Sequence, residues 1–183
     1  MRFVLAVTGA QGVGKSTLCE ALSKELAAAG YAVERTTQLG PLLHADGVKL
    51  GSQSNSATIP AVFNAHVERE LTYACSESLI LYDRCAADAL AYTRTLNVSS
   101  TDTKVICEGL TKSLLNRINL IVSLQLSAAF AAKGGGHETP ALREAISTEI
   151  ESIVIGSGRP YIRVDAADGL AISQIVEKIR SLH

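Results

Sequence analysis

Short apolar runs alternate along the chain with longer segments in which apolar residues recur every three or four positions. The first run, residues 3–7, is apolar throughout, as is typical of parallel strands buried on both faces. Four later runs have the length and composition of strands: residues 31–36, 79–82, 118–126 and 161–164. The pattern therefore predicts five strands.

Helical periodicity fills most of the chain between these runs. It predicts helices at residues 16–29, from Pro60 to about residue 76, and at residues 88–96, 102–115, about 142–154 and 172–182. In the helix that begins at Pro60, we expect Phe63, Val67, Leu71 and Ala74 to form the buried face. Strands that alternate with helices predict an α/β fold, a parallel sheet with helices on both faces.

Two segments interrupt this alternation. Residues 37–60 are polar and aperiodic, so we predict a long loop with at most a helical turn near Leu42; loops of this length are usually functional or mobile. Residues 134–136 are three consecutive glycines, typical of the edge of a moving loop. We find no internal repeat and no interdomain linker, and therefore expect one domain over residues 1–183 with a mobile lid around residues 127–143.

Composition narrows the class of protein. The 183 residues are 47% hydrophobic, which argues against a disordered chain. Their net charge of −1 argues against broad binding to nucleic acid or to an anionic membrane surface. The scarcity of aromatic residues argues against a base-stacking platform. The four cysteines form no C-x-x-C pair and are expected to be buried thiols. With no signal peptide and no membrane span recognised, we expect a cytoplasmic protein.

A phosphate-binding loop lies between the first strand and the first helix. Residues 9–16 read G-x-x-x-x-G-K-S, a spacing whose backbone N–H groups can surround an anion at the start of a helix. Lys15 would reach the β- and γ-phosphates, and the Ser16 hydroxyl would ligate Mg²⁺. The strand before the motif and the helix after it are the context that this mechanism requires. The predicted nucleotide-binding residues are Gly9, Gln11, Gly12, Val13, Gly14, Lys15, Ser16 and Thr17.

Other motifs separate the classes of phosphate-loop protein. The absence of N-K-x-D argues against a guanine-specific GTPase, and the absence of L-S-G-G-Q argues against a transporter ATPase. The chain also has little room for the helical lid domain of ring-forming motors. A compact, kinase-like protein remains.

A second group of polar residues follows the third strand. Asp83 ends this strand, where ligands bind in open α/β sheets, and could hold Mg²⁺ or accept the proton of an attacking hydroxyl. Arg84 could grip a phosphate. The alternative is that Asp83 caps the next helix and Arg84 is a surface residue. Asp88 is equally compatible with helix capping and with substrate binding.

Residues 9–17 together with the D-R-x-x-x-D-x-x-x-Y run that begins at Asp83 resemble the P-loop nucleoside/nucleotide kinase-like superfamily. The likeness extends over most of the chain and is greatest to small AAA-like ATP-binding proteins that include the nicotinamide riboside kinase domain. The resemblance implies strand order 2-3-1-4-5, ATP with Mg²⁺ as cofactors, and phosphoryl transfer to a small acceptor that bears a hydroxyl or phosphate group.

The resemblance also suggests residues for the lid, the acceptor and the adenine. Arg143 is the lid candidate, because it begins a helix and is expected to face away from the apolar stripe; the alternative is a solvated helix arginine. Glu34 and Asn64 occupy places comparable to acceptor-binding residues, and Arg159 and Tyr161 are candidates for contact with the adenine. Few arginines follow the fourth strand, a departure from the family pattern.

These observations predict a small-molecule kinase. Lys15, Arg84 and Arg143 would neutralise the transferred phosphoryl group, while Ser16 and Asp83 would hold Mg²⁺. The sparse lid and the long segment 37–60 leave two alternatives open. One is a nucleotide-dependent switch or slow ATPase that acts on a protein partner, and the other is a nucleotide binder without turnover.

Overall fold

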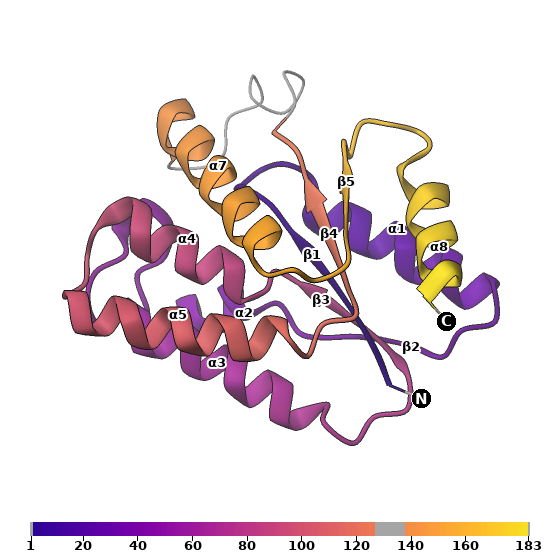
Figure 1. Ribbon diagram of the computed structural model, residues 1–183, viewed down its shortest axis with the longest axis horizontal. Coiled ribbons are helices and arrows are strands. Elements are labelled where there is room, and N and C mark those ends of the chain that lie inside the picture. The colour runs from indigo at the N-terminus through magenta and orange to yellow at the C-terminus, as the bar shows by residue number, and fades with distance from the viewer. Residues whose placement is uncertain (1, 127–137, 183) are drawn as a thin grey trace.

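A computed structural model describes residues 2–126 and 138–182, which form one five-stranded sheet (Figure 1). The strands are β1 (Phe3–Thr8), β2 (Val33–Arg35), β3 (Leu79–Asp83), β4 (Leu120–Leu124) and β5 (Tyr161–Val164). All neighbouring strands are parallel and follow the order β2-β3-β1-β4-β5. The predicted α/β fold and strand order are confirmed.

Helices cover both faces of this sheet (Figure 1). On one face lie α1 (Lys15–Ala28) and α8 (Ala171–Leu182), which pack against Phe3, Leu5 and Val7 of β1. The other face, which presents Val4 and Ala6 of the same strand, is covered by α3 (Thr58–Thr72), α4 (Ala86–Leu96), α5 (Thr101–Leu115) and α7 (Pro140–Gly156). Successive side chains of a strand point to opposite faces, so the unbroken apolar run of β1 supplies two cores.

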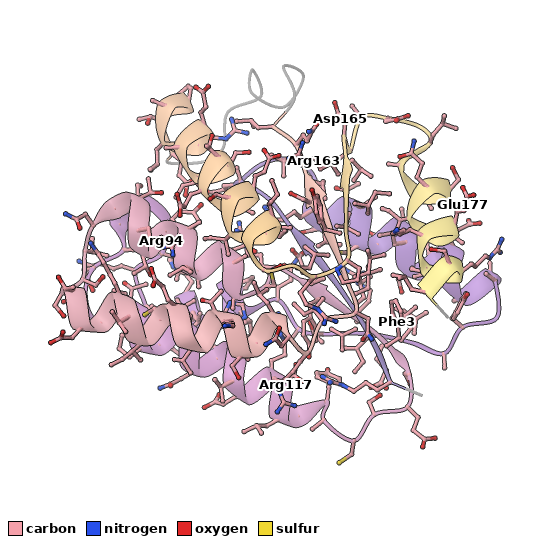
Figure 2. The ribbon with its side chains drawn as sticks, viewed as in Figure 1. Phe3, Arg94, Arg117, Arg163, Asp165 and Glu177 are labelled. Carbon is pink, nitrogen blue, oxygen red and sulfur yellow. The ribbon has the colours of Figure 1, made fainter. Side chains whose placement is uncertain are left out.

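Arg94 links three helices of the second layer. Its guanidinium donates to Glu108 Oε1 of α5 at 2.7 Å and to Glu149 Oε1 of α7 at 2.7 Å. Figure 2 shows Arg94 on α4, between these two helices. The two ion pairs fix α4, whose first turn carries part of the site described below.

The segment that we predicted as a loop contains more regular structure than expected. It forms the helix α2 (Leu39–Ala45) and the 3₁₀ turn η1 (Gly51–Gln53). Leu43 is buried, and α2 lies against α3. The polar composition concealed this helix because one buried leucine gives too weak a periodic signal.

The predicted buried face of α3 is wrong beyond Phe63. The helix begins at Thr58 and turns His66, Arg69 and Glu70 inward, whereas Leu71 is 69% exposed. The buried polar groups have partners: Arg69 lies over the Tyr82 ring at 3.8 Å, and Tyr82 donates to Glu70 at 2.9 Å. Paired polar side chains can replace apolar ones in a core, which a count of hydrophobic positions does not detect.

Other expectations have mixed outcomes. Cys19, Cys85 and Cys107 are buried free thiols as predicted, but Cys75 is exposed. None of the helices in the described ranges is long and apolar enough to cross a bilayer. The assignment of one domain to residues 1–183 and the mobile lid around residues 127–143 stay predictions, and residues 127–137 of that lid lie outside the described part of the chain.

Candidate active site

The phosphate-binding loop leaves the carboxyl end of β1 and enters α1. Gly9 passes so close to β4 that a Cβ on it would lie 2.8 Å from the Leu124 carbonyl oxygen. Gly14, with φ of 91°, is the left-handed residue from which α1 begins. Glycine is needed at both places, for close approach at the first and for a positive φ at the second. The loop therefore presents the amino end of α1 to the site, as an anion-binding loop requires.

Lys15 is folded back over its own loop. Its Nζ donates to the Gly9 carbonyl at 2.7 Å and also to the Ala10 carbonyl. Burial of this ammonium, together with the nearby charge of Arg84, lowers its pKa to about 7, although Asp88, Asp83 and Glu138 act in the opposite direction. Lys15 is thus a desolvated cation whose charged form an anion would stabilise.

Ser16 and Asp83, the two predicted magnesium ligands, lie within hydrogen-bond distance of each other. The Ser16 hydroxyl donates to Asp83 Oδ2 at 2.7 Å. Gln38, which follows β2, donates from Nε2 to the same carboxylate oxygen at 2.6 Å and to Ser16 Oγ at 2.8 Å. A hydroxyl and a carboxylate beside a phosphate-binding loop supply oxygen ligands of the kind that Mg²⁺ prefers. In the described ranges, no cluster of three or more His, Cys, Asp or Glu side chains offers an alternative metal site.

Arg84 has a backbone conformation that is rare for a residue with a side chain. Its φ is 76°. Its N–H donates to the Val7 carbonyl at 2.9 Å, and its carbonyl accepts from Arg69 Nη1 at 3.1 Å. Such a conformation costs about 1–3 kcal/mol and persists where the surroundings fix it. The strained turn points the Arg84 guanidinium to Asp88 Oδ1, 3.0 Å away.

Asp88 rather than Asp83 caps α4. Its Oδ2 accepts from the Cys85 N–H at 2.9 Å in a capping box and from the Thr8 hydroxyl at 2.7 Å. Both sequence interpretations of Asp88 are compatible with its position, because it caps the helix and also lines the cavity described next. The alternative in which Asp83 is the cap and Arg84 a surface residue is wrong.

A single cavity of about 1040 Å³ contains these groups and continues beyond them. Its phosphate end is formed by the loop residues and by Asp83, Arg84 and Asp88. The other end is an apolar compartment between α2, η1, α3 and α4; its apolar lining residues include Leu39, Leu43, Leu50, Ile59, Val62, Phe63, Ala89 and Val98. One polyphosphate and one small organic molecule could therefore lie end to end in the cavity.

Several predicted site residues do not line this cavity. Glu34 accepts a hydrogen bond from Ser76 on the side of β2, and Asn64 is exposed on the outer face of α3. Neither position suits an acceptor-binding residue, so both expectations are corrected. Arg159 donates twice to the Ile118 carbonyl and lies, like Tyr161, outside the cavity. Sequence alone could not distinguish these residues from lining residues, because the loops decide which face meets the ligand.

Arg143 was predicted to be either a lid residue or a solvated helix arginine, and its environment differs from both. It is 1% exposed, not solvated, and its Nε donates to the Gln11 carbonyl at 3.0 Å. It therefore supports the phosphate-binding loop from α7 instead of lining the cavity. From sequence, an arginine in the first turn of an amphipathic helix is expected to face solvent. The sequence does not show that a carbonyl group from a distant loop lies within hydrogen-bond distance of it.

Sequence reasoning missed Gln38, His66 and Arg69. All are held by side-chain hydrogen bonds, and Gln38 and His66 line the cavity. A signal existed for the helix residues, since His66 follows Phe63 by three positions and Ile59 by seven, and so shares their face. No spacing in the sequence marks Gln38.

Comparisons with known proteins agree with this architecture. A family model described as "AAA domain" matches residues 4–169. A thymidylate kinase of Shouchella clausii (strain KSM-K16) is 29% identical over 99 residues, which cover 48% of this chain and 46% of the relative. The chain thus spans about half the length of this curated relative.

Solved structures share the fold at low sequence identity. The NadR protein in complex with NR superposes with a TM-score of 0.75 at 14% identity, covering 99% of this chain and 51% of that one. Deoxyadenosine kinase from M. mycoides superposes with a TM-score of 0.68 at 17% identity, covering 98% of this chain and 100% of the kinase. The family match over residues 4–169 shows that the chain belongs to the AAA domain family, and its fold is similar to that of P-loop nucleoside and nucleotide kinases.

Proposed function

We propose that this protein is a kinase that transfers the γ-phosphoryl group of ATP to a hydroxyl of a small acceptor of the nucleoside or nucleotide type. The observation that carries the proposal is the continuity of the cavity. A cradle for polyphosphate opens directly into an apolar compartment, and Asp83 and Arg84 lie in the lining of the same cavity. An acceptor ring in that compartment would direct its hydroxyl toward the terminal phosphate.

The loop would hold the triphosphate in this reaction. Backbone N–H groups of residues 9–17 bind the phosphate oxygens, and Lys15 turns from its own loop carbonyls to the β- and γ-phosphates. Ser16 and Asp83 would hold Mg²⁺, which neutralises phosphate charge when bound. Arg143 is a positioning residue, since its 3.0 Å hydrogen bond to the Gln11 carbonyl holds the phosphate-binding loop against α7.

The transfer itself requires alignment more than covalent chemistry. The acceptor hydroxyl oxygen forms a bond to the γ-phosphorus while the bond to the β,γ-bridging oxygen breaks and ADP leaves. Lys15 and Arg84 line the same end of the cavity, so both cations would act on the transferred phosphoryl group. Asp83 orients the attacking hydroxyl, whose proton passes to an oxygen of the transferred phosphoryl group or to water.

The segment at residues 37–60 supports a kinase over a switch that acts on a protein partner. As a loop exposed to a partner, it would favour the switch. Instead, α2 and η1 from this segment form a wall of the cavity, and Leu43 and Thr58 are buried. This segment is therefore better suited to enclosing a small acceptor.

The proposal is tested by ADP release in the presence of ATP and Mg²⁺, with and without a panel of nucleosides, nucleotides and nicotinamide riboside. We expect at least one acceptor to stimulate release, and Lys15→Ala to lower the stimulated rate about 10²-fold or more. Lys24→Ala, at an exposed lysine of the same helix, is the matched control and should keep the wild-type rate. Slow release that no acceptor stimulates would favour the ATPase alternative.

A further inference from the structure

His66 occupies an unusual position in the acceptor compartment. It is 4% exposed and lines the cavity one turn after Val62 and Phe63. Its Nδ1 lies 3.0 Å from Arg69 Nη2. A guanidinium has donors only, so Nδ1 must be the acceptor in this hydrogen bond and the ring proton must be on Nε2. The neighbouring arginine thereby determines the tautomer of His66.

The Arg69 guanidinium is itself held in place. Its Nη1 donates to the Arg84 carbonyl at 3.1 Å, and its carbon atom Cζ lies 3.8 Å from the centre of the Tyr82 ring. The orientation of the imidazole is thus fixed by a chain of contacts that begins at the strained turn after β3. A preorganised donor of this kind loses little entropy when it binds a ligand.

The Nε2–H group of His66 is a donor available to a ligand. No residue in the described ranges is hydrogen-bonded to it. Burial, and then the positive charges of Arg69 and Arg84, hold the pKa of His66 well below its usual range, so the ring is neutral. The Arg69 charge beside the imidazole opposes a cationic ring there, whereas Arg84 is paired with Asp88.

We propose that His66 selects the acceptor by donating from Nε2–H to a carbonyl oxygen or ring nitrogen of an uncharged heterocycle seated against Phe63. This inference rests on the proposed function and deepens it. It assigns uncharged nucleobases to the compartment in preference to the pyridinium cation of nicotinamide riboside. A buried donor left without its partner costs about 1–3 kcal/mol, so an analogue that lacks the acceptor atom is bound poorly.

The test compares the wild type with His66→Phe and His66→Gln. Phenylalanine keeps a flat ring but has no donor, whereas glutamine keeps a donor on a chain of similar reach. Binding of thymidine, deoxycytidine, deoxyadenosine, deoxyguanosine and nicotinamide riboside is measured by calorimetry with a non-hydrolysable ATP analogue present. Values of kcat/KM are measured for every acceptor that is phosphorylated.

We expect an uncharged nucleoside to bind the wild type most tightly, with its affinity falling about tenfold or more in His66→Phe and partly restored in His66→Gln. Affinity for the ATP analogue should stay within about twofold in both variants, which excludes general misfolding. Equal nucleoside binding by wild type and His66→Phe, preference for the pyridinium, or no nucleoside binding by the wild type would each overturn the inference. His66-dependent nucleoside binding without phosphorylation would instead contradict the proposed function and leave this inference standing.

Discussion

Lys15 must be positively charged to bind a polyphosphate, but its buried position in the free protein favours the neutral form. A polyphosphate needs a cation at this place, yet burial beside Arg84 destabilises the charged form and lowers the pKa to about 7. The carbonyl oxygens of Gly9 and Ala10 stabilise the ammonium only in part. A bound polyphosphate would stabilise it far more, so nucleotide binding and protonation of Lys15 should be coupled.

The coupling has a definite sign. Above pH 7 the free protein holds Lys15 mainly neutral, whereas the complex with ATP holds it charged, so binding takes up a proton. Between about pH 7.5 and the usual pKa of a lysine side chain, we expect the affinity for ATP to fall roughly tenfold for each pH unit. Calorimetry at pH 8 in two buffers of different ionisation enthalpy should detect uptake of close to one proton.

Lys15→Arg provides the control for this coupling. Its guanidinium remains charged at all accessible pH values, so ATP binding by this variant should take up no proton at pH 8. Proton uptake by the variant equal to that of the wild type would assign the coupling to another group.

At single-residue scale, the sequence predicted groups whose chemistry depends on local spacing. Lys15 and Ser16 follow a loop between a strand and a helix that fixes their directions, and Asp83 ends the neighbouring strand, so the sequence could predict that they lie close together. Glu34 and Asn64 were misplaced and Gln38 was missed, since their roles depend on how a distant segment folds over the sheet. Arg143 was predicted as a lid residue, whereas its side chain donates to the Gln11 carbonyl of the phosphate-binding loop.

Among the elements, α4 carries part of the site and depends on its cap. Asp88 joins the Cys85 N–H, the Thr8 hydroxyl and the Arg84 guanidinium at the first turn of this helix. These contacts connect β1, the turn after β3 and α4 beside the phosphate end of the cavity.

Asp88→Ala should therefore lower the free energy of unfolding by about 2–4 kcal/mol, through loss of the cap and of the partner of a partly buried arginine. Urea denaturation at constant slope measures this change. Asp102→Ala removes an exposed acid from the first turn of α5 and should change stability by less than about 0.5 kcal/mol. Similar losses in both variants would contradict the special role of Asp88.

The rotation of α3 about its axis gives a second prediction for an element. Phe63 is 2% exposed, whereas Leu71, assigned to the same face by sequence, is 69% exposed. Phe63→Ala should lower the free energy of unfolding by about 3–5 kcal/mol, and Leu71→Ala by less than about 0.5 kcal/mol. Thermal or urea unfolding of the two variants checks this, and a large effect of Leu71→Ala would restore the face predicted from sequence.

The existence of the long elements could be predicted because their apolar periodicity is strong. β1, α5 and α7 lie close to their predicted ranges. The short α2 could not be predicted, because its stability comes from contacts with other elements. The buried face of α3 was mispredicted beyond Phe63, because it is made of polar residues. Buried pairs such as Arg69 with Tyr82 reverse the rule that polar residues face solvent.

For the molecule as a whole, strand order is the decisive feature. β1 lies between β3 and β4, so the loop after β1 meets the carboxyl end of β3 on one side and Leu124 of β4 on the other. Ligands of open α/β sheets bind at such a position. The segment between β2 and β3 then folds over this edge as α2, η1 and α3 and encloses the second compartment.

The most direct measurement follows the phosphoryl group itself. ATP labelled with ¹⁸O at the three non-bridging oxygens of the γ-phosphate is incubated with the protein, Mg²⁺ and the acceptor panel, and the products are analysed by mass spectrometry. We expect a phosphorylated acceptor that carries all three labelled oxygens, formed by the wild type and lost in Lys15→Ala. Label found solely in inorganic phosphate, with every acceptor unchanged, would contradict it.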